Sequence, residues 1–280
     1  MKANSCGLAC LFLLCLIGCA GSPALSAAAS PRLTKSGDTS QGLNNDILSA
    51  LRSMPAGLGY ASDRAAEIRL AERGVLWRGA PQLSISPAGA SPTFCSSACY
   101  MALLLALQNW ERSQPSPVFS TQVWQRLRIY PQHPDGYLSW GRINANGPGL
   151  AKWVYDLRAG VNFSSVQYAR PGDFLKFFHS SAIGAHERGH LIIFLGLVEQ
   201  AGQKYVRYWS CNKPGGYGVR MVLLQKMHHP IFTRITHPER IARVVALPAS
   251  DSWLAAMLSQ DCPYSEVRAK CSISEEPAHQ

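Results

Sequence analysis

The sequence predicts an α+β fold, and three observations support that prediction. Helical patterns occupy the chain up to about Arg170, short strand-like segments follow one another beyond it, and 280 residues are enough for one sizeable core. Hydrophobic residues make up 47% of the chain and charged residues 16%, a globular balance that argues against general disorder. We therefore expect function to reside in a folded site.

The first nineteen residues have the layout of a secretory signal. Lys2 precedes an apolar run over residues 6–17 that is too short to span a bilayer. The stretch ending at Cys19 (LIGC) resembles a bacterial lipobox, in which the cysteine is lipidated; ordinary cleavage near Ala27 or Ala28 is the alternative. Both interpretations predict export, with residues 1–19 as the signal and 20–42 as a flexible tether.

Residues 43–260 are expected to form a single domain that begins with helices. Apolar spacing predicts short helices over 45–54 and 62–74, and further helices over 118–129 and 150–158 on either side of a long loop at 131–149. The segment 95–110 is apolar on nearly every side. Such a helix belongs in the middle of a domain.

The period of the pattern changes beyond Arg170. Segments 173–178, 190–197, 205–212 and 218–224 are rich in β-formers and are separated by turn-rich stretches, which predicts a meander of antiparallel strands under the central helix. Residues 244–258 suggest a further strand and helix. Residues 261–280 are expected to be a polar tail.

Cysteine usage is informative because four of the nine cysteines fall in the leader. Five cysteines remain outside the leader: Cys95, Cys99, Cys211, Cys262 and Cys271. Because five is an odd number, at least one of these thiols is unpaired or serves chemistry. Cys262 and Cys271 lie nine positions apart in the tail, where export favours a small disulfide loop.

The formal net charge of +10 favours anionic partners, among them nucleic acid, acidic lipid headgroups and cell-wall polymers. No basic run interleaved with aromatic residues appears, so we expect no nucleic-acid ligand. His228 and His229 point opposite ways in a strand, no Cys or His spacing fits zinc, and no phosphate loop is present. The sequence therefore predicts no cofactor and no metal.

A thiol and an imidazole are the strongest candidates for chemistry. Cys95 stands where the apolar helix begins, so the helix dipole favours its thiolate, although a structural buried thiol is the alternative. Cys99, one turn further, suits that structural role. His190 opens an apolar strand, and an imidazole so placed can take the thiol proton and later protonate a leaving amine.

The strand after His190 offers a third polar group. The two-residue period places Ser210 and Asn212 on one face, and either could accept the second N–H of the imidazole. Asn212 would otherwise be a turn residue before Lys213 and Pro214.

Three short motifs in this order resemble a known family. They are Cys95-Ser96-Ser97 opening an apolar helix, Arg170-Pro171-Gly172-Asp173 leading into a strand, and Gly189-His190 opening the next strand. Over about residues 91–224 the chain resembles the papain-like cell-wall cysteine peptidases of the NlpC superfamily, with their CHAP amidase relatives. The resemblance implies a papain-like core with Cys95 as nucleophile, His190 as base and Asn212 or Ser210 as the orienting residue.

From this resemblance we expect a cysteine hydrolase that cleaves an amide or peptide bond in the peptide stems of bacterial peptidoglycan. It would act as a monomer in the cell envelope, in the periplasm or outside the cytoplasmic membrane, and its lipid anchor would be its one membrane contact. Two alternatives remain at this point: the same fold acting as an acyltransferase, and a non-enzymatic lipoprotein that binds the wall or a partner protein.

Overall fold

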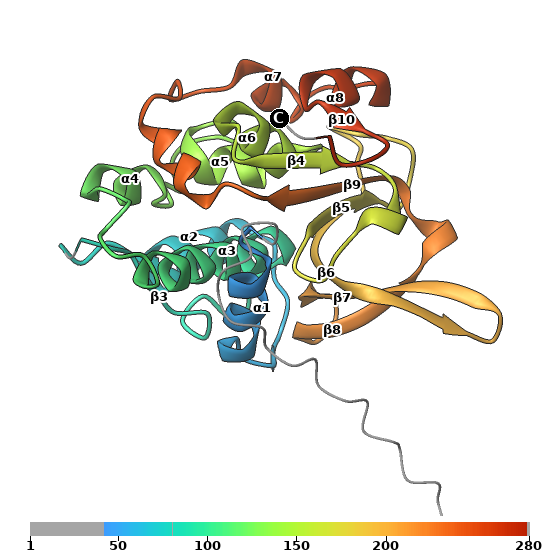
Figure 1. The fold of residues 1–280 in the computed structure, drawn as a ribbon, viewed down its shortest axis with the longest axis horizontal. Coiled ribbons are helices and arrows are strands. Elements are labelled where there is room, and N and C mark those ends of the chain that lie inside the picture. The colour runs from blue at the N-terminus through green and yellow to red at the C-terminus, as the bar shows by residue number, and fades with distance from the viewer. Residues whose placement is uncertain (1–41, 80, 279–280) are drawn as a thin grey trace, which may run out of the picture. The chain divides into compact units, whose positions relative to one another are not determined.

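The computed structural model describes residues 42–79 and 81–278, all of which belong to one compact unit. The expected signal, the lipidation of Cys19 and the tether up to residue 41 lie outside the described residues. The architecture is mixed α+β, with one large sheet and most helices gathered along one side of it (Figure 1). The predicted fold class is thus confirmed at this level.

The large sheet has eight strands in the order β1-β8-β7-β6-β5-β9-β4-β10. Neighbouring strands are antiparallel except for the parallel pair β4 and β10. In chain order these strands are β1 Gly57–Leu58, β4 Gly160–Phe163, β5 Phe174–Phe178, β6 Gly189–Gln200, β7 Gln203–Asn212, β8 Gly216–Leu223, β9 His228–Ile235 and β10 Ile273–Ser274. The consecutive antiparallel run from β5 to β8 is the meander that the strand pattern predicts. A separate ribbon pairs β2 Val75–Leu76 with β3 Ser84–Ile85.

Alternate side chains bury both faces of the central strands. Leu191, Ile193 and Trp209 belong to the core shared with the helices, whereas Ile192 and Phe194 belong to a second core on the other face. Because both faces are buried, these strands are continuous apolar runs in the sequence rather than alternating ones.

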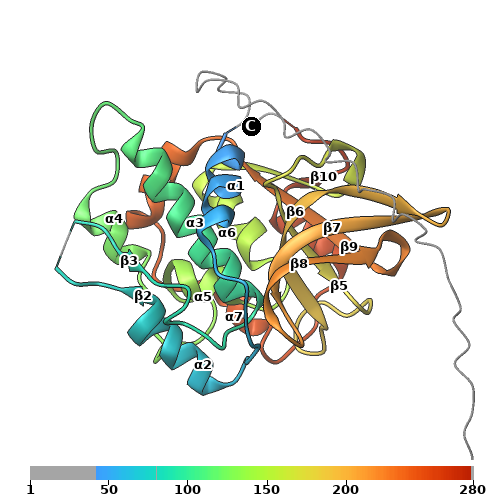
Figure 2. The same cartoon turned by 90° about the horizontal axis from the view of Figure 1, so that it is seen from below.

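Helix α3 (Cys95–Arg112) is the central helix, packed on β6, β7 and α1 (Figure 2). The others are shorter: α1 Asn44–Ser53, α2 Arg64–Arg69, α4 Thr121–Arg126, α5 Leu138–Asn144, α6 Gly149–Leu157, α7 Ser252–Ala256 and α8 Tyr264–Lys270. A π-helical turn, Leu70–Gly74, extends α2, and the longest 3-10 helix within the described residues is Pro238–Val245.

Ser97 fixes the first turn of α3. Its Oγ accepts a hydrogen bond from the backbone N–H of Phe94, the residue before the helix, at 3.1 Å. This contact is the half of a capping box in which a polar side chain at the third helical position satisfies the N-cap amide. The start of the helix, and with it Cys95, is therefore set locally.

Two expectations for irregular regions are wrong. Helix α5 lies inside the predicted loop 131–149, where it buries Trp140 and Ile143 against the central core. The expected tail folds as α8 and β10, since Val267 and Ile273 are buried in a third core cluster. Both elements are stabilised by tertiary burial rather than by a strong local pattern.

The expected disulfide between Cys262 and Cys271 is not formed, because both thiols are free. Cys271 is fully buried among apolar side chains, whereas the Cys262 sulfur lies 3.7 Å from the carbonyl oxygen of Pro263. Cys271 is thus a buried core residue rather than one half of a disulfide.

A buried carboxylate joins α1, β5 and β9. Asp173 has no exposed surface, and both its oxygens accept hydrogen bonds from the Arg234 guanidinium at 2.7–2.8 Å. Asn44 Nδ2 and the backbone N–H of Arg170 donate to the same carboxylate, each at 2.8 Å. Such a pair is favourable only while its geometry is complete.

We predict that Asp173→Ala destabilises the protein by about 3–5 kcal/mol, because it leaves the Arg234 guanidinium buried without a carboxylate. Urea unfolding followed by circular dichroism measures the change. Glu199→Ala removes an exposed carboxylate from β6 and is the control, with an expected change within about 0.5 kcal/mol. Equal losses for the two variants would contradict the role assigned to Asp173.

Candidate active site

Cys95 is the first residue of α3 and is partly buried. The first N–H groups of a helix have no partners within it, and the positive end of the dipole lies at the same place. The thiol lines a cavity of about 210 Å³. It is therefore both accessible and in a setting that favours negative charge.

His190 is the second residue of β6, opposite Phe177 of β5 in the sheet register. Its ring is held edge-to-face by Phe177 and Tyr208, with centroids 5.8 and 5.7 Å away. Its charge and its hydrogen-bonding capacity both lower the pKa of the Cys95 thiol. The structure thus brings together the two residues that the sequence nominates.

Asn212 is the last residue of β7 and is 5% exposed. Its Nδ2 donates to the carbonyl oxygens of Ser210 at 2.9 Å and Gly218 at 3.1 Å. With both amide hydrogens used, its Oδ1 faces Nε2 of His190 as an acceptor, 3.3 Å away. The imidazole Nε2 therefore carries the hydrogen, and Nδ1 keeps its lone pair for the proton of Cys95.

Ser210 does not reach the imidazole. Its hydroxyl donates to the backbone carbonyl of Leu191 at 2.9 Å and has no exposed surface. Of the two alternatives for the third residue, Asn212 contacts His190, whereas the Ser210 hydroxyl is directed to the backbone of Leu191.

The electrostatics separate Cys95 from its neighbouring thiols. Burial raises the pKa of Cys95, but the charge of His190 and hydrogen bonds to His190 and Leu191 outweigh burial and lower this pKa from 9.0 to about 7. Burial raises the pKa of Cys99 well above its usual range and that of Cys211 to about 12. Only Cys95 of these three is an effective nucleophile near neutral pH.

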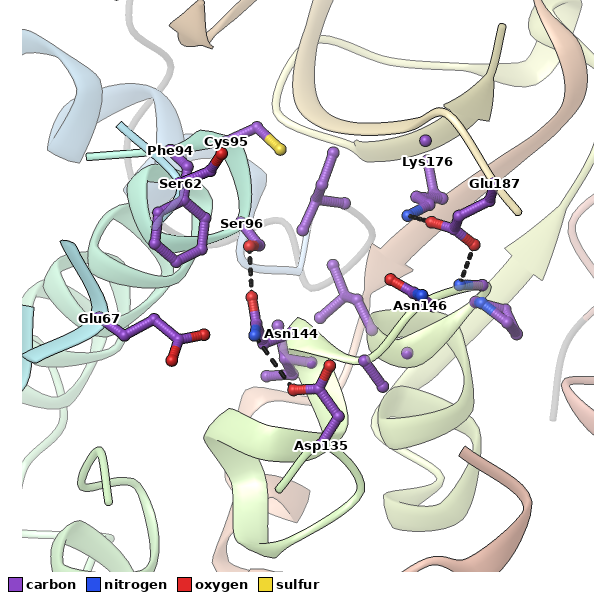
Figure 3. A pocket seen from close by; sticks show the side chains of 18 residues that line it. Ser62, Glu67, Phe94, Cys95, Ser96, Asp135, Asn144, Asn146, Lys176 and Glu187 are labelled. Atoms are coloured by element: carbon purple, nitrogen blue, oxygen red, sulfur yellow. Dashed lines mark hydrogen bonds and ion pairs between the residues drawn. The ribbon is translucent and has the colours of Figure 1, made fainter. Parts of the chain in front are cut away.

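The cavity beside Cys95 is lined mainly by polar side chains (Figure 3). Ser96 donates to Oδ1 of Asn144 at 2.7 Å, and Nδ2 of Asn144 donates to Asp135 at 3.1 Å. Across the cavity, Lys176 forms an ion pair with Glu187 at 2.5 Å. Glu67 also lines it, so carboxylates outnumber the ammonium group among the described lining residues.

Sequence reasoning missed Asp135, Asn144 and Glu187, which lie in or beside irregular segments that carry no periodic signal. Lys176 did leave a signal. It is the single charged residue of the apolar segment 174–178, where a solvent-facing position and a functional one give the same pattern.

No protein-family model, curated protein or solved structure matches the chain. Within residues 42–79 and 81–278 no helix is long and apolar enough to cross a membrane. The same residues hold no group of three His, Cys, Asp or Glu side chains arranged to bind a metal ion.

We predict that alkylation of Cys95 by iodoacetamide accelerates as the pH rises through about 7, because the reactive thiolate forms in that range. Rates measured by peptide mass spectrometry between pH 5 and 10 give the midpoint for each cysteine. His190→Ala removes the cation that most favours the thiolate, so its midpoint should lie well above 7. An identical midpoint in that variant would show that His190 does not act on the thiol.

The cavity predicts a preference for cationic thiol reagents. Burial raises the pKa of Asp135 to about 6, so this carboxyl gains its charge between about pH 5 and 7. Over that range the rate ratio of 2-aminoethyl to 2-sulfonatoethyl methanethiosulfonate at Cys95 should rise. Asp135→Asn should flatten the rise, whereas a neutral methyl reagent, the control, should react equally with both proteins. A preference for the anionic reagent would contradict the charge assigned to the cavity.

Proposed function

We propose that this protein is an exported cysteine hydrolase that cleaves an amide or peptide bond in bacterial peptidoglycan. One observation carries the proposal: an imidazole in contact with Asn212 acts on a helix-start thiol and lowers its pKa to about 7. This is the arrangement in which a base activates a nucleophile and a third group orients the base.

The reaction follows from these positions. The Cys95 thiolate attacks the amide carbonyl carbon, and the carbonyl electrons move onto oxygen, next to the free N–H groups of the first turn of α3. His190 then gives its proton to the leaving nitrogen, the C–N bond breaks and a thioester forms. Water, deprotonated by His190, attacks the thioester, which releases the carboxylic acid and restores Cys95.

Peptidoglycan is proposed as the substrate on two grounds. The motifs around Cys95, Asp173 and His190 resemble those of cell-wall peptidases, and a net charge of +10 suits an anionic wall polymer. Export through the leader, a lipid anchor at Cys19 in the cell envelope and a monomeric state complete the proposal.

The site favours hydrolysis over the two alternatives. Acyl transfer between lipids needs a long apolar groove, whereas the cavity at Cys95 has a volume of about 210 Å³ and charged and amide side chains make up much of its lining. A non-enzymatic protein would leave Cys95 cross-linked or inert, but this thiol is free and its pKa is lowered.

We predict that the wild-type protein releases new fragments from purified peptidoglycan under reducing conditions and that Cys95→Ala releases none. Mass spectrometry of the soluble fraction identifies the bond that is cut. The non-enzymatic alternative would be favoured if neither protein released fragments while the Cys95→Ala variant still bound the wall.

Asn212 and Ser210 provide a matched pair. Asn212→Ala removes the acceptor that orients the imidazole, so kcat should fall about 10²-fold. Ser210→Ala removes a hydrogen bond to Leu191 and an interaction with Cys99, neither of which involves the imidazole, and should leave kcat within a few-fold of wild type. A larger loss for Ser210→Ala than for Asn212→Ala would reassign the third residue.

A further inference from the structure

Lys176 of β5 lines the same cavity as the candidate nucleophile. It is paired in register with Leu191 of β6, the residue whose carbonyl oxygen accepts a hydrogen bond from the Cys99 thiol of α3. Its side chain is 16% exposed and lines the cavity that contains Cys95 (Figure 3). The sheet register therefore places a lysine on the wall of the cavity that contains the nucleophile, from a strand that the proposed reaction does not otherwise use.

The ammonium group is held by Glu187, whose side chain is only 6% exposed. Oε2 of Glu187 accepts hydrogen bonds from the backbone N–H groups of Gly184, at 3.1 Å, and Gly147. This carboxylate is thus fixed to two loops. Nζ of Lys176 also lies 5.2 Å from the centre of the Phe178 ring, which favours a cation there.

Gly189 leaves the space in which this ion pair lies. A Cβ at that position would come within 2.5 Å of both Lys176 Nζ and Glu187 Oε1. The pair therefore rests against the backbone of Gly189, the residue immediately before His190. Any side chain there would require the ion pair to shift.

Several groups face Cys95 from the surrounding elements. His190 of β6 and Lys176 of β5 are the cationic ones; Tyr60, Cys99 of α3, and Tyr208 and Cys211 of β7 interact with the thiol as uncharged groups near neutral pH. The carboxylates of Glu67, Asp135 and Glu187 lie on the cavity wall. After burial and the effects of His190 and Leu191, Lys176 is the remaining influence that lowers the pKa of Cys95.

We propose that Lys176 is a positioning residue of this active site: its ammonium, held by Glu187 against Gly189, stabilises the Cys95 thiolate independently of the charge on His190. A contribution of Lys176 to hydrolysis rests on the proposed function. The effect of Lys176 on the Cys95 thiolate is independent of that function, because it requires only the ammonium group and the sulfur.

The test measures the pH dependence of Cys95 alkylation by iodoacetamide in the full-length protein. Lys176→Gln removes the charge and keeps a group that can hydrogen-bond Glu187, so the midpoint should rise by about half a pH unit, with a roughly threefold lower rate below pH 7. Lys176→Arg keeps the charge and should restore the wild-type midpoint. Lys204→Gln, at an exposed position of β7, is the control and should have no effect.

Two further variants separate electrostatics from folding. Glu187→Gln removes the neutralising carboxylate and leaves the lysine charged, so the midpoint should fall. In a His190→Ala background, Lys176→Gln should raise the midpoint again by a similar amount. An unchanged midpoint in Lys176→Gln, or a rise in Glu187→Gln, would overturn the proposal.

Peptidoglycan digestion distinguishes this proposal from the proposed function. If the wild type releases no fragments while Lys176→Gln still shifts the midpoint, hydrolysis fails and the role of the lysine stands. If fragments are released and the midpoint does not move, hydrolysis stands and the role of the lysine fails.

Discussion

The buried carboxylate of Asp173 determines where the strand beneath the candidate site begins. It receives hydrogen bonds from Asn44 of α1 and Arg234 of β9, so two distant segments converge on the start of β5, and the backbone N–H of Arg170 closes the turn before it. The register of β5 then sets β6, with Phe177 opposite His190 and Lys176 opposite Leu191. A slip of one residue in the pairing of β5 with β6 would turn the side chains of the slipped strand, Lys176 or His190 among them, to the other face of the sheet. The chemistry at Cys95 thus depends on a buried ion pair that takes no part in it.

The position of the nucleophile depends on a second contact, between α3 and β6. Cys99, one turn beyond Cys95, is buried and its thiol donates to the carbonyl oxygen of Leu191 at 3.4 Å. The helix is therefore fixed to the residue of β6 that directly follows His190. The structural role that the sequence suggests for Cys99 has a geometric consequence, since this bond fixes the first turn of α3 relative to His190.

Much of the fold and part of the site could be predicted because they carry strong local patterns. The apolar helix at Cys95 and the strands around His190 and Asn212 are long or bounded by turns. Helix α5 and strand β10 are short and depend on burial of Trp140 and Ile273, which no local window reveals. The choice between Ser210 and Asn212 lay beyond the sequence for a related reason: the two share a strand face, and only contacts across strands tell them apart.

The two cations near Cys95 have different consequences for the proposed reaction. His190 favours the thiolate only while its ring is protonated, yet the second half of the reaction needs a neutral imidazole to take a proton from water. At that stage the Cys95 sulfur leaves as a thiolate. An imidazole that begins this step as a neutral base carries no positive charge with which to stabilise that thiolate. Lys176 takes no part in that proton transfer, and its ion pair with Glu187 holds it on the wall of the cavity that contains Cys95. In the proposed reaction its cation would therefore support the leaving thiolate in the step in which the imidazole acts as a base.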